Sequence, residues 1–339
     1  MARFRRLAII NVELAPRVFD AFDNTVAFPR LESVYLLKGY PLSLDCPWLW
    51  EAVRRAPRLD KVFVQDTEWE IPYEVLTGWN MRLLELTCLS VSGQSLRERL
   101  LSILPTLRNL EFLTLRDFSE GPSWLDFSLV RCESLRGLKI IQSDSDTSRV
   151  ILQNLDLPNL VSLDLTFHEQ VDSFEGLFSP LSSFSSLRVL SLVFDRPPSD
   201  RIARILNKVP NLTVFAAGVH YHASSFDSLD PLPQLCAELA VRPTVCPKLR
   251  LLTLAVEEDR VTRSMLENIQ NFIEGRGSTL SHVKLVTTPP RVPRAIQDEE
   301  VIAALQLVRT ACHKFEHIIL PCALFQRETP IEAHHSLLD

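Results

Sequence analysis

The stretch Pro158-Asn-Leu-Val-Ser-Leu-Asp-Leu165 has the spacing that decides the fold: a proline, a polar residue and then leucines in the order L-x-x-L-x-L. The same phrase returns, with other apolar residues at some leucine positions, at Pro29–Leu36, Pro57–Val64, Pro210–Ala217 and Pro247–Leu254. In an extended segment, the residues three and five places after the first leucine point the same way. Each copy therefore predicts one short strand with a core side and an open side.

Twelve copies of this phrase follow one another along the chain. We call the first apolar residue of each copy its anchor, and the anchors are Phe4, Leu31, Leu59, Leu83, Leu110, Leu135, Leu160, Leu187, Leu212, Leu249, Leu280 and Phe315. The fourth copy can equally be anchored at Leu86. The residues three and five places after every anchor are apolar. Eight of the eleven intervals are 24 to 28 residues long, which is the range of leucine-rich repeats.

The segments between these strands carry apolar residues at helical spacing. The clearest examples are Gln94–Leu104, Asp200–Val209 and Met265–Ile273. The sequence therefore predicts an α/β leucine-rich-repeat solenoid, a horseshoe of about twelve irregular repeats with a parallel inner sheet and helices outside. We expect one such domain over residues 1–325 and a polar tail over residues 326–339.

Composition limits the classes of partner. The chain has 339 residues, a net charge of −6 and no run of five basic residues, so we do not expect it to bind nucleic acid or an anionic membrane. The apolar run near the N-terminus ends at Asn11, which is too short for a signal peptide. No apolar stretch approaches the roughly 20 residues that cross a bilayer, and we expect neither secretion nor membrane insertion.

The cysteines predict a reducing environment. There are seven, with no C-x-x-C pair, which is typical of reduced thiols in the cytoplasm or nucleus. Cys132, Cys246 and Cys312 each lie three residues before an anchor, in a column shared with Phe28, Ala56, Leu107, Leu157, Phe184 and Val209. We interpret them as core residues and not as metal ligands.

The repeated phrase and its helix-containing spacers resemble the repeat region of fungal F-box-type leucine-rich-repeat proteins, over essentially the whole chain. The repeats depart from the standard pattern because the asparagine of L-x-x-L-x-L-x-x-N is missing, so irregular loops are expected. The resemblance implies that the repeats select the substrate of a ubiquitin ligase, while an N-terminal F-box module recruits the ligase scaffold.

That module is not found within this sequence. The first repeat is already under way at Phe4, and the only similar phrase, Ile71–Leu76, lies inside a spacer and lacks the continuing helical pattern. The apolar edge formed by Phe4, Leu7 and Ile9 would be exposed without a cap. We expect an F-box-like module before Met1 in relatives.

No catalytic motif is present. The sequence has no G-x-S-x-G, no phosphate-binding glycine loop and no His-Glu-x-x-His. His313 and His317 are four residues apart across a predicted strand start, and His220 and His222 open the longest insertion without an obvious third ligand. We therefore predict no enzyme activity, no cofactor and no metal.

The open side of the predicted sheet is the expected partner-binding surface. Its first part combines aromatic residues with arginine and lysine, a composition typical of interface hot spots. The predicted partner-binding residues are Tyr35, Leu37, Phe63, Phe112, Arg116, Lys139 and Asp164. The alternative is that the aromatic side chains pack only on one another across neighbouring strands.

A second part of the open side is predicted to be an uncharged strip. It comprises Val189, Ser191, Val193, Val214, Ala216, Gly218, Leu251, Thr253 and Ala255. An exposed strip of this size needs a cover or a partner. The turn-rich segment Ala223–Pro233, within the insertion over residues 219–245, is a candidate cover, and the sequence does not separate this from partner binding.

These observations predict a monomeric, non-enzymatic scaffold that recognises another protein, such as the substrate of a ubiquitin ligase. The alternative is a stand-alone structural or inhibitory repeat protein with no connection to a ligase.

Overall fold

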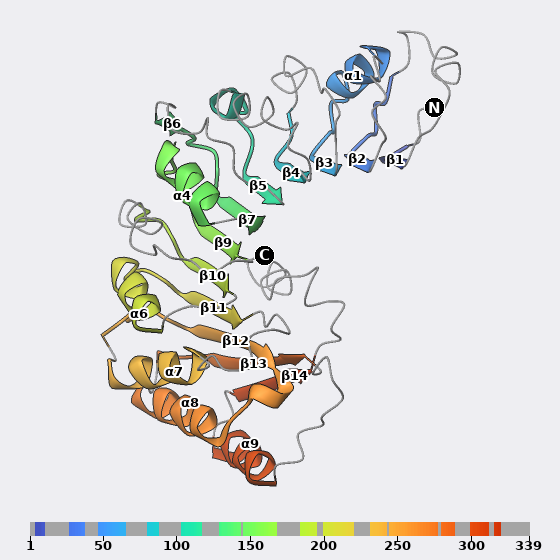
Figure 1. The fold of residues 1–339 in the computed structure, drawn as a ribbon. Coiled ribbons are helices and arrows are strands. Elements are labelled where there is room, and N and C mark those ends of the chain that lie inside the picture. The colour runs from blue at the N-terminus through green and yellow to red at the C-terminus, as the bar shows by residue number, and fades with distance from the viewer. Residues whose placement is uncertain are drawn as a thin grey trace. The chain divides into compact units, whose positions relative to one another are not determined.

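The fold is described from a computed structural model (Figure 1). It describes residues 4–10, 27–37, 47–65, 80–87, 103–116, 129–143, 145–167, 184–194, 199–219, 231–242, 244–276, 279–288, 299–311 and 315–319. The chain forms two compact units, Met1–Leu160 and Val161–Asp339. Each unit is described by itself.

In the first unit, the described residues form six parallel strands that lie side by side in chain order. They are β1 (Arg6–Ile10), β2 (Ser33–Leu37), β3 (Lys61–Gln65), β4 (Leu83–Thr87), β5 (Phe112–Arg116) and β7 (Gly137–Ser143). The spacers contain helices α1 (Pro47–Arg54) and α4 (Ser145–Asn154), together with a short 3₁₀ helix over Leu104–Thr106. The short strands β6 (Val130–Arg131) and β8 (Leu155–Asp156) form a separate parallel pair.

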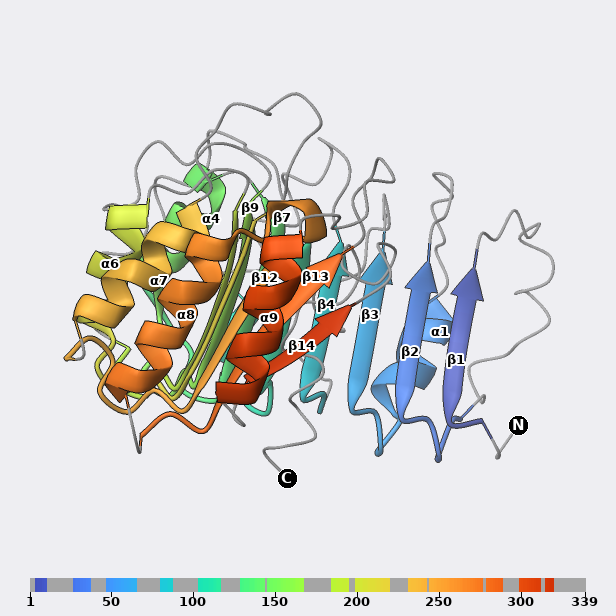
Figure 2. The same ribbon diagram turned by 90° about the horizontal axis from the view of Figure 1, so that it is seen from below.

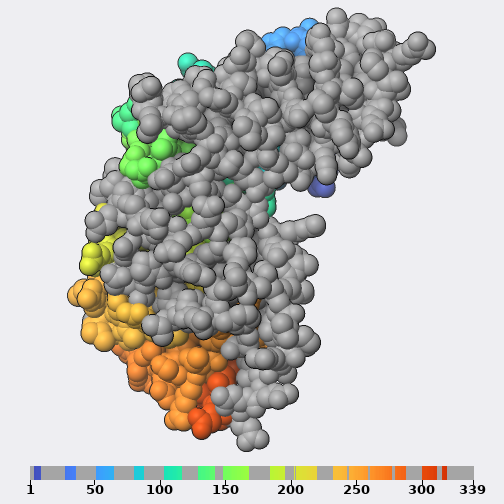
Figure 3. All heavy atoms as spheres, in the orientation of Figure 1, coloured from blue at the N-terminus to red at the C-terminus, as the bar shows by residue number. Residues whose placement is uncertain are grey.

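The second unit repeats this arrangement with longer helices. Its parallel strands are β9 (Ser162–Phe167), β10 (Val189–Phe194), β11 (Val214–Val219), β12 (Leu251–Glu257), β13 (His282–Thr288) and β14 (Phe315–Ile319). The helices are α6 (Ser199–Lys208), α7 (Pro231–Val241), α8 (Arg263–Arg276) and α9 (Glu299–Ala311), with a 3₁₀ helix over Glu258–Arg260. These described helices cover the same face of the sheet (Figure 2), and α7, α8 and α9 form much of the coloured surface of this unit in Figure 3. The predicted α/β class with parallel strands is confirmed.

The strand register aligns the predicted columns. Val34 lies beside Val62, and Leu190 lies beside Phe215, so residues three places after the anchors are neighbours. These residues and the anchors Leu31, Leu160 and Leu212 are almost fully buried. Burial of such apolar side chains contributes about 1.5–3 kcal/mol each, so these columns are the core.

A recurrent pair of backbone hydrogen bonds starts β2, β3, β4, β5, β7, β10, β11, β12 and β13. The carbonyl oxygen one residue after an anchor accepts two N–H groups from the start of the next strand. The carbonyl of Glu32 accepts from Asp60 and Lys61, and that of Thr213 accepts from Arg250 and Leu251. This pair of hydrogen bonds is repeated within both units. It therefore fixes the register of a strand relative to its neighbour.

Two copies have a different register from the predicted one. Leu83 lies beside Phe112 on the open side, and the fourth anchor is Met81, which is 1% exposed. In the last copy Phe315 lies beside Val283, so Phe315 stands three places after the true anchor position instead of at it. Phe315 is buried, whereas Ile318 falls on the open side and is only partly buried.

The cysteine column is confirmed for the two members that the structure describes. Cys132 and Cys246 are buried, free thiols, and Cys312 lies outside the described residues. Burial raises the pKa of the Cys246 thiol to about 12. Cys246 stands in a turn with a positive φ of 49°, and its Sγ donates to the carbonyl of Leu206, 3.2 Å away.

Buried Arg276, at the end of α8, stabilises the same turn. Its guanidinium donates to the carbonyl of Cys246 at 2.9 Å and to that of Val245. The Cζ atom of this guanidinium also lies over the Phe272 ring, 5.3 Å from the ring centroid, in a cation–π contact. Burial lowers the pKa of Arg276 from its ordinary value, but hydrogen bonds of this kind stabilise the charged form.

The helix predictions are confirmed for Asp200–Val209 and Met265–Ile273, which correspond to α6 and α8. Most of Gln94–Leu104 lies outside the described residues. Pro231–Pro233, expected in a turn-rich segment, forms instead the first turn of α7, where Leu232, Leu235 and Cys236 are buried. Proline suits a first helical turn because the missing N–H would have no partner in the helix there.

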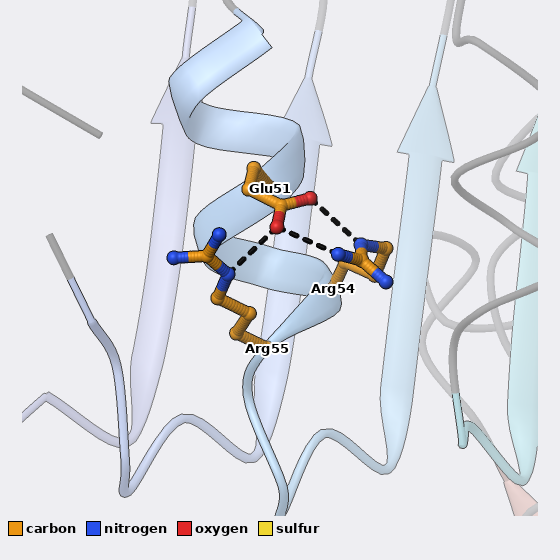
Figure 4. Close-up of polar contacts among 3 residues, drawn as sticks. All are labelled: Glu51, Arg54 and Arg55. Carbon is orange, nitrogen blue, oxygen red and sulfur yellow. Dashed lines mark hydrogen bonds and ion pairs between the residues drawn. The ribbon is translucent and has the colours of Figure 1, made fainter. Parts of the chain in front are cut away.

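Helix α1 shows how the outside of the first unit is charged. Glu51 accepts hydrogen bonds from Arg54 and Arg55 on the next turn (Figure 4). The hydrogen bond from Arg54 lowers the pKa of Glu51 to about 2. These groups face solvent, and the pair orders the helix surface without a large contribution to stability.

We predict that Leu163→Asp destabilises the second unit by about 4 kcal/mol or more, because it buries an unpaired carboxylate in place of a packed side chain. Leu163 is fully buried in β9, whereas Leu307 on α9 is 65% exposed, so Leu307→Asp is the matched control. Thermal melting followed by circular dichroism measures both. If the two variants melted alike, the assigned core column would be wrong.

Candidate recognition surface

The strands of the first unit bury one side and leave the other partly open. In β5, Leu113 and Leu115 are buried, whereas Phe112, Thr114 and Arg116 are partly exposed. In β4, Leu84 and Leu86 are likewise buried, and Leu83 and Glu85 are partly exposed. We name the outward residues of β1, β2, β3, β4, β5 and β7 the open face of the first unit.

Two aromatic side chains from neighbouring strands stack on the open face. The rings of Tyr35 in β2 and Phe63 in β3 are parallel within 2°, with centroids 4.4 Å apart. Both side chains remain partly exposed. The residues therefore pack on each other, as one alternative predicted, and still present an accessible aromatic surface.

A third aromatic side chain lies farther along the same face. Phe112 in β5 leans over Gly137 in β7, because a Cβ atom at Gly137 would lie only 2.5 Å from Cδ1 of the Phe112 ring. The missing side chain at Gly137 therefore determines where the Phe112 ring lies. The sequence prediction identified Phe112 but not the role of Gly137.

Charged groups surround these aromatic residues. Arg116 lies 3.7 Å from Glu85 on the next strand, and both side chains are partly exposed. Lys139 in β7 is also partly exposed, and Arg6 and Lys61 are exposed. The structure thus brings Tyr35, Phe63, Phe112, Arg116 and Lys139 together on one sheet.

One predicted residue does not join this group, and the side chain of another is not described. Asp164 lies in the second unit and is only 4% exposed, so it offers no accessible carboxylate to a partner. Leu37 ends β2, but its side chain lies outside the described residues.

The expected uncharged strip of the second unit is buried. Strand β10 is buried at all six positions, and β9, β11 and β12 are buried on both sides over most of their length. Ser191 and Ala255 have no exposed surface, while Val214 and Leu251 are partly exposed. The strip is therefore largely covered, which is one of the two alternatives that the sequence left open, and residues 220–230 of its candidate cover lie outside the described residues.

The histidines do not form a metal site in the part of the chain that the structure describes. No group of three His, Cys, Asp or Glu side chains is suitably placed there, and His220, His222 and His313 lie outside it. Nδ1 of His317 lies 3.1 Å from the Arg309 guanidinium, and its Nε2 lies 2.9 Å from the Thr287 hydroxyl. Since arginine can only donate, His317 is neutral, with its proton on Nε2.

Comparison with protein-family models finds no match to this chain, and comparison with curated proteins finds none either. Among the helices that the structure describes, none combines the length and apolar character that a membrane-spanning helix needs.

We predict that Gly137→Ala destabilises the first unit by about 1–2 kcal/mol, because the new methyl group overlaps the Phe112 ring. Phe112→Ala should remove this overlap, so the double variant should lose less stability than the sum of the single variants. Urea unfolding of the parent, the two single variants and the double variant measures the coupling free energy between Gly137 and Phe112. Additive losses would show that the two residues do not contact each other.

We predict that the edge of the second unit weakens as the pH falls through about 6.5. Burial, and then the Arg309 charge, lowers the pKa of His317, so the unfolded chain takes up the proton at a higher pH than the folded chain. The contribution of neutral His317 to the free energy of unfolding is therefore complete above the pKa that His317 has in the unfolded chain. It is lost as the pH falls below that value. The carboxylate of Glu316, the neighbouring residue on the same strand, forms an ion pair with Lys284, and 3.4 Å separates Oε2 from Nζ.

The test of this prediction compares thermal melting of the parent and His317→Gln between about pH 7 and about pH 5. The melting temperature of the parent should fall further than that of the variant, which cannot be protonated. Parallel curves would contradict the assigned role of His317.

Proposed function

We propose that the chain is a leucine-rich-repeat protein that recognises another protein through the open face of the first unit. The observation that carries this proposal is the Tyr35–Phe63 stack, an ordered aromatic surface that remains accessible on the sheet. Aromatic side chains beside arginine are the residues that most often dominate the energy of a protein interface.

The rigidity of this surface supports the proposal. Tyr35 and Phe63 stand on strands whose other side is core, with Val34, Val62 and Val64 nearly fully buried. Side chains held in this way lose little conformational entropy when a partner binds. Phe112, placed by Gly137, extends the same surface by two strands.

The fungal F-box-type resemblance adds a proposal about the partner's identity. If the repeats of this chain act as they do in that family, the bound protein is the substrate of a ubiquitin ligase. This part rests on the repeat phrase alone, and ligase scaffold subunits recovered with the chain would support it. Partners recovered without them would favour a stand-alone repeat protein.

The proposal is tested by affinity capture with the full chain and with a Tyr35→Ala, Phe63→Ala double variant. We expect the double variant to bind the captured partner at least about thirtyfold more weakly, since two central aromatic contacts are lost. Leu129→Ala is the matched control, because Leu129 is an exposed apolar residue of the same unit. Circular dichroism confirms that each variant is folded. A partner retained equally by all three proteins would contradict recognition by this face.

A further inference from the structure

The open face of the first unit has a charge opposite to that of the whole chain. Eighteen residues of β1, β2, β3, β4, β5 and β7 occupy its outward positions, and they include Arg6, Lys61, Arg116 and Lys139 but only one acidic residue, Glu85. These residues give a net charge of +3, whereas the chain has −6. The positive charge is therefore concentrated on the face that carries the aromatic stack.

The neighbouring column of charges behaves differently. One residue after the anchors, Arg5 lies 3.7 Å from Glu32, and Arg82 lies 3.3 Å from Asp60 and 4.0 Å from Glu111. In this column, basic and acidic side chains on neighbouring strands therefore neutralise each other. On the open face Arg116 is paired with Glu85, but Arg6 and Lys61 have no ion pair in the described part of the chain and are exposed.

The two exposed cations lie beside the aromatic stack. Strand pairing places Arg6, Ser33 and Lys61 in one row across β1, β2 and β3. Tyr35 and Phe63 stand two residues farther along β2 and β3, which is about 7 Å along a strand. A ligand on this surface would contact cations and aromatic rings at alternate residues of an extended segment.

Resting on the proposed function, we propose that the partner binds through an extended acidic segment in which a carboxylate and an aromatic side chain are two residues apart. The carboxylates lie over the row of Arg6 and Lys61, and the aromatic side chain lies on Tyr35 and Phe63. Opposite charges across an interface accelerate association and exclude basic competitors.

The test uses fluorescein-labelled synthetic peptides and fluorescence anisotropy with the full chain. The probe repeats Glu-Ser-Tyr-Ser, which puts Glu and Tyr on the same side of an extended chain. Controls repeat Lys-Ser-Tyr-Ser, Ser-Ser-Tyr-Ser and Glu-Tyr-Ser-Ser, the last having the same composition with the spacing changed. We expect the probe to bind at least about tenfold more tightly than each control, with an affinity that falls as salt is added.

A matched pair of variants locates the interaction. Arg6→Glu with Lys61→Glu should weaken binding of the probe by about tenfold or more. Arg30→Glu with Arg58→Glu makes the same change of charge at exposed positions one residue before the anchors of β2 and β3, and it should have little effect. Equal binding of the four peptides, no binding of the probe up to about 1 mM, equal effects of the two variant pairs, or tighter binding of a single-stranded oligonucleotide would overturn the proposal.

The captured partner separates this proposal from the proposed function. A partner lost on Tyr35→Ala with Phe63→Ala but retained by Arg6→Glu with Lys61→Glu would overturn only the acidic segment. A partner retained by both variants would overturn recognition by the open face itself.

Discussion

The pair of backbone hydrogen bonds at the start of most of the described strands is the constraint on which the rest of the structure depends. One carbonyl oxygen, such as that of Glu111, accepts the N–H groups of two successive residues in the next strand, Arg136 and Gly137. Just before it, a tight turn joins the anchor N–H to the carbonyl three residues earlier, as from Leu249 to Cys246 at 3.0 Å. Where both occur they fix where the strand begins, so the alternation of core and outward residues is in phase between neighbours.

This phase has different consequences in the two units. In the first, many outward residues remain partly exposed and are large or charged, as at Tyr35, Phe63 and Arg116, although Ser33 and Thr87 are buried. In the second, most outward residues of β10, β11 and β12 are buried and several are small, such as Ser191, Ala216 and Ala255, although Val214 and Leu251 are partly exposed. Small side chains allow close packing on both sides of a sheet. The same strand pattern therefore gives an accessible surface in one unit and a two-sided core in the other, and only the first suits a large partner.

The strands could be predicted from the sequence because the L-x-x-L-x-L spacing indicates both where each strand lies and which of its side chains are buried. It misplaced the fourth anchor because the run Met81-Arg-Leu-Leu-Glu-Leu86 offers apolar residues at more than one phase, and only pairing of Lys61 with Leu83 identifies Met81. It misplaced the last anchor because both Phe315 and Ile318 are apolar, and the pairing of Phe315 with Val283 decides between them. Burial of Ser191 and Asp164 could not be predicted, since alternation along one strand carries no information about what lies above it.

The spacing of the open face also limits what a partner can present. Tyr35 and Phe63 are on adjacent strands, with ring centroids 4.4 Å apart, so together they form one broad aromatic contact. Lys61 stands two residues before Phe63 on the same strand, a separation of about 7 Å that an extended chain reproduces between alternate side chains. A helix places neighbouring side chains of one face about 5–6 Å apart and turns them away after one or two contacts. An extended segment therefore matches the row of cations and the aromatic stack at the same time, because its own period is that of the strands beneath it.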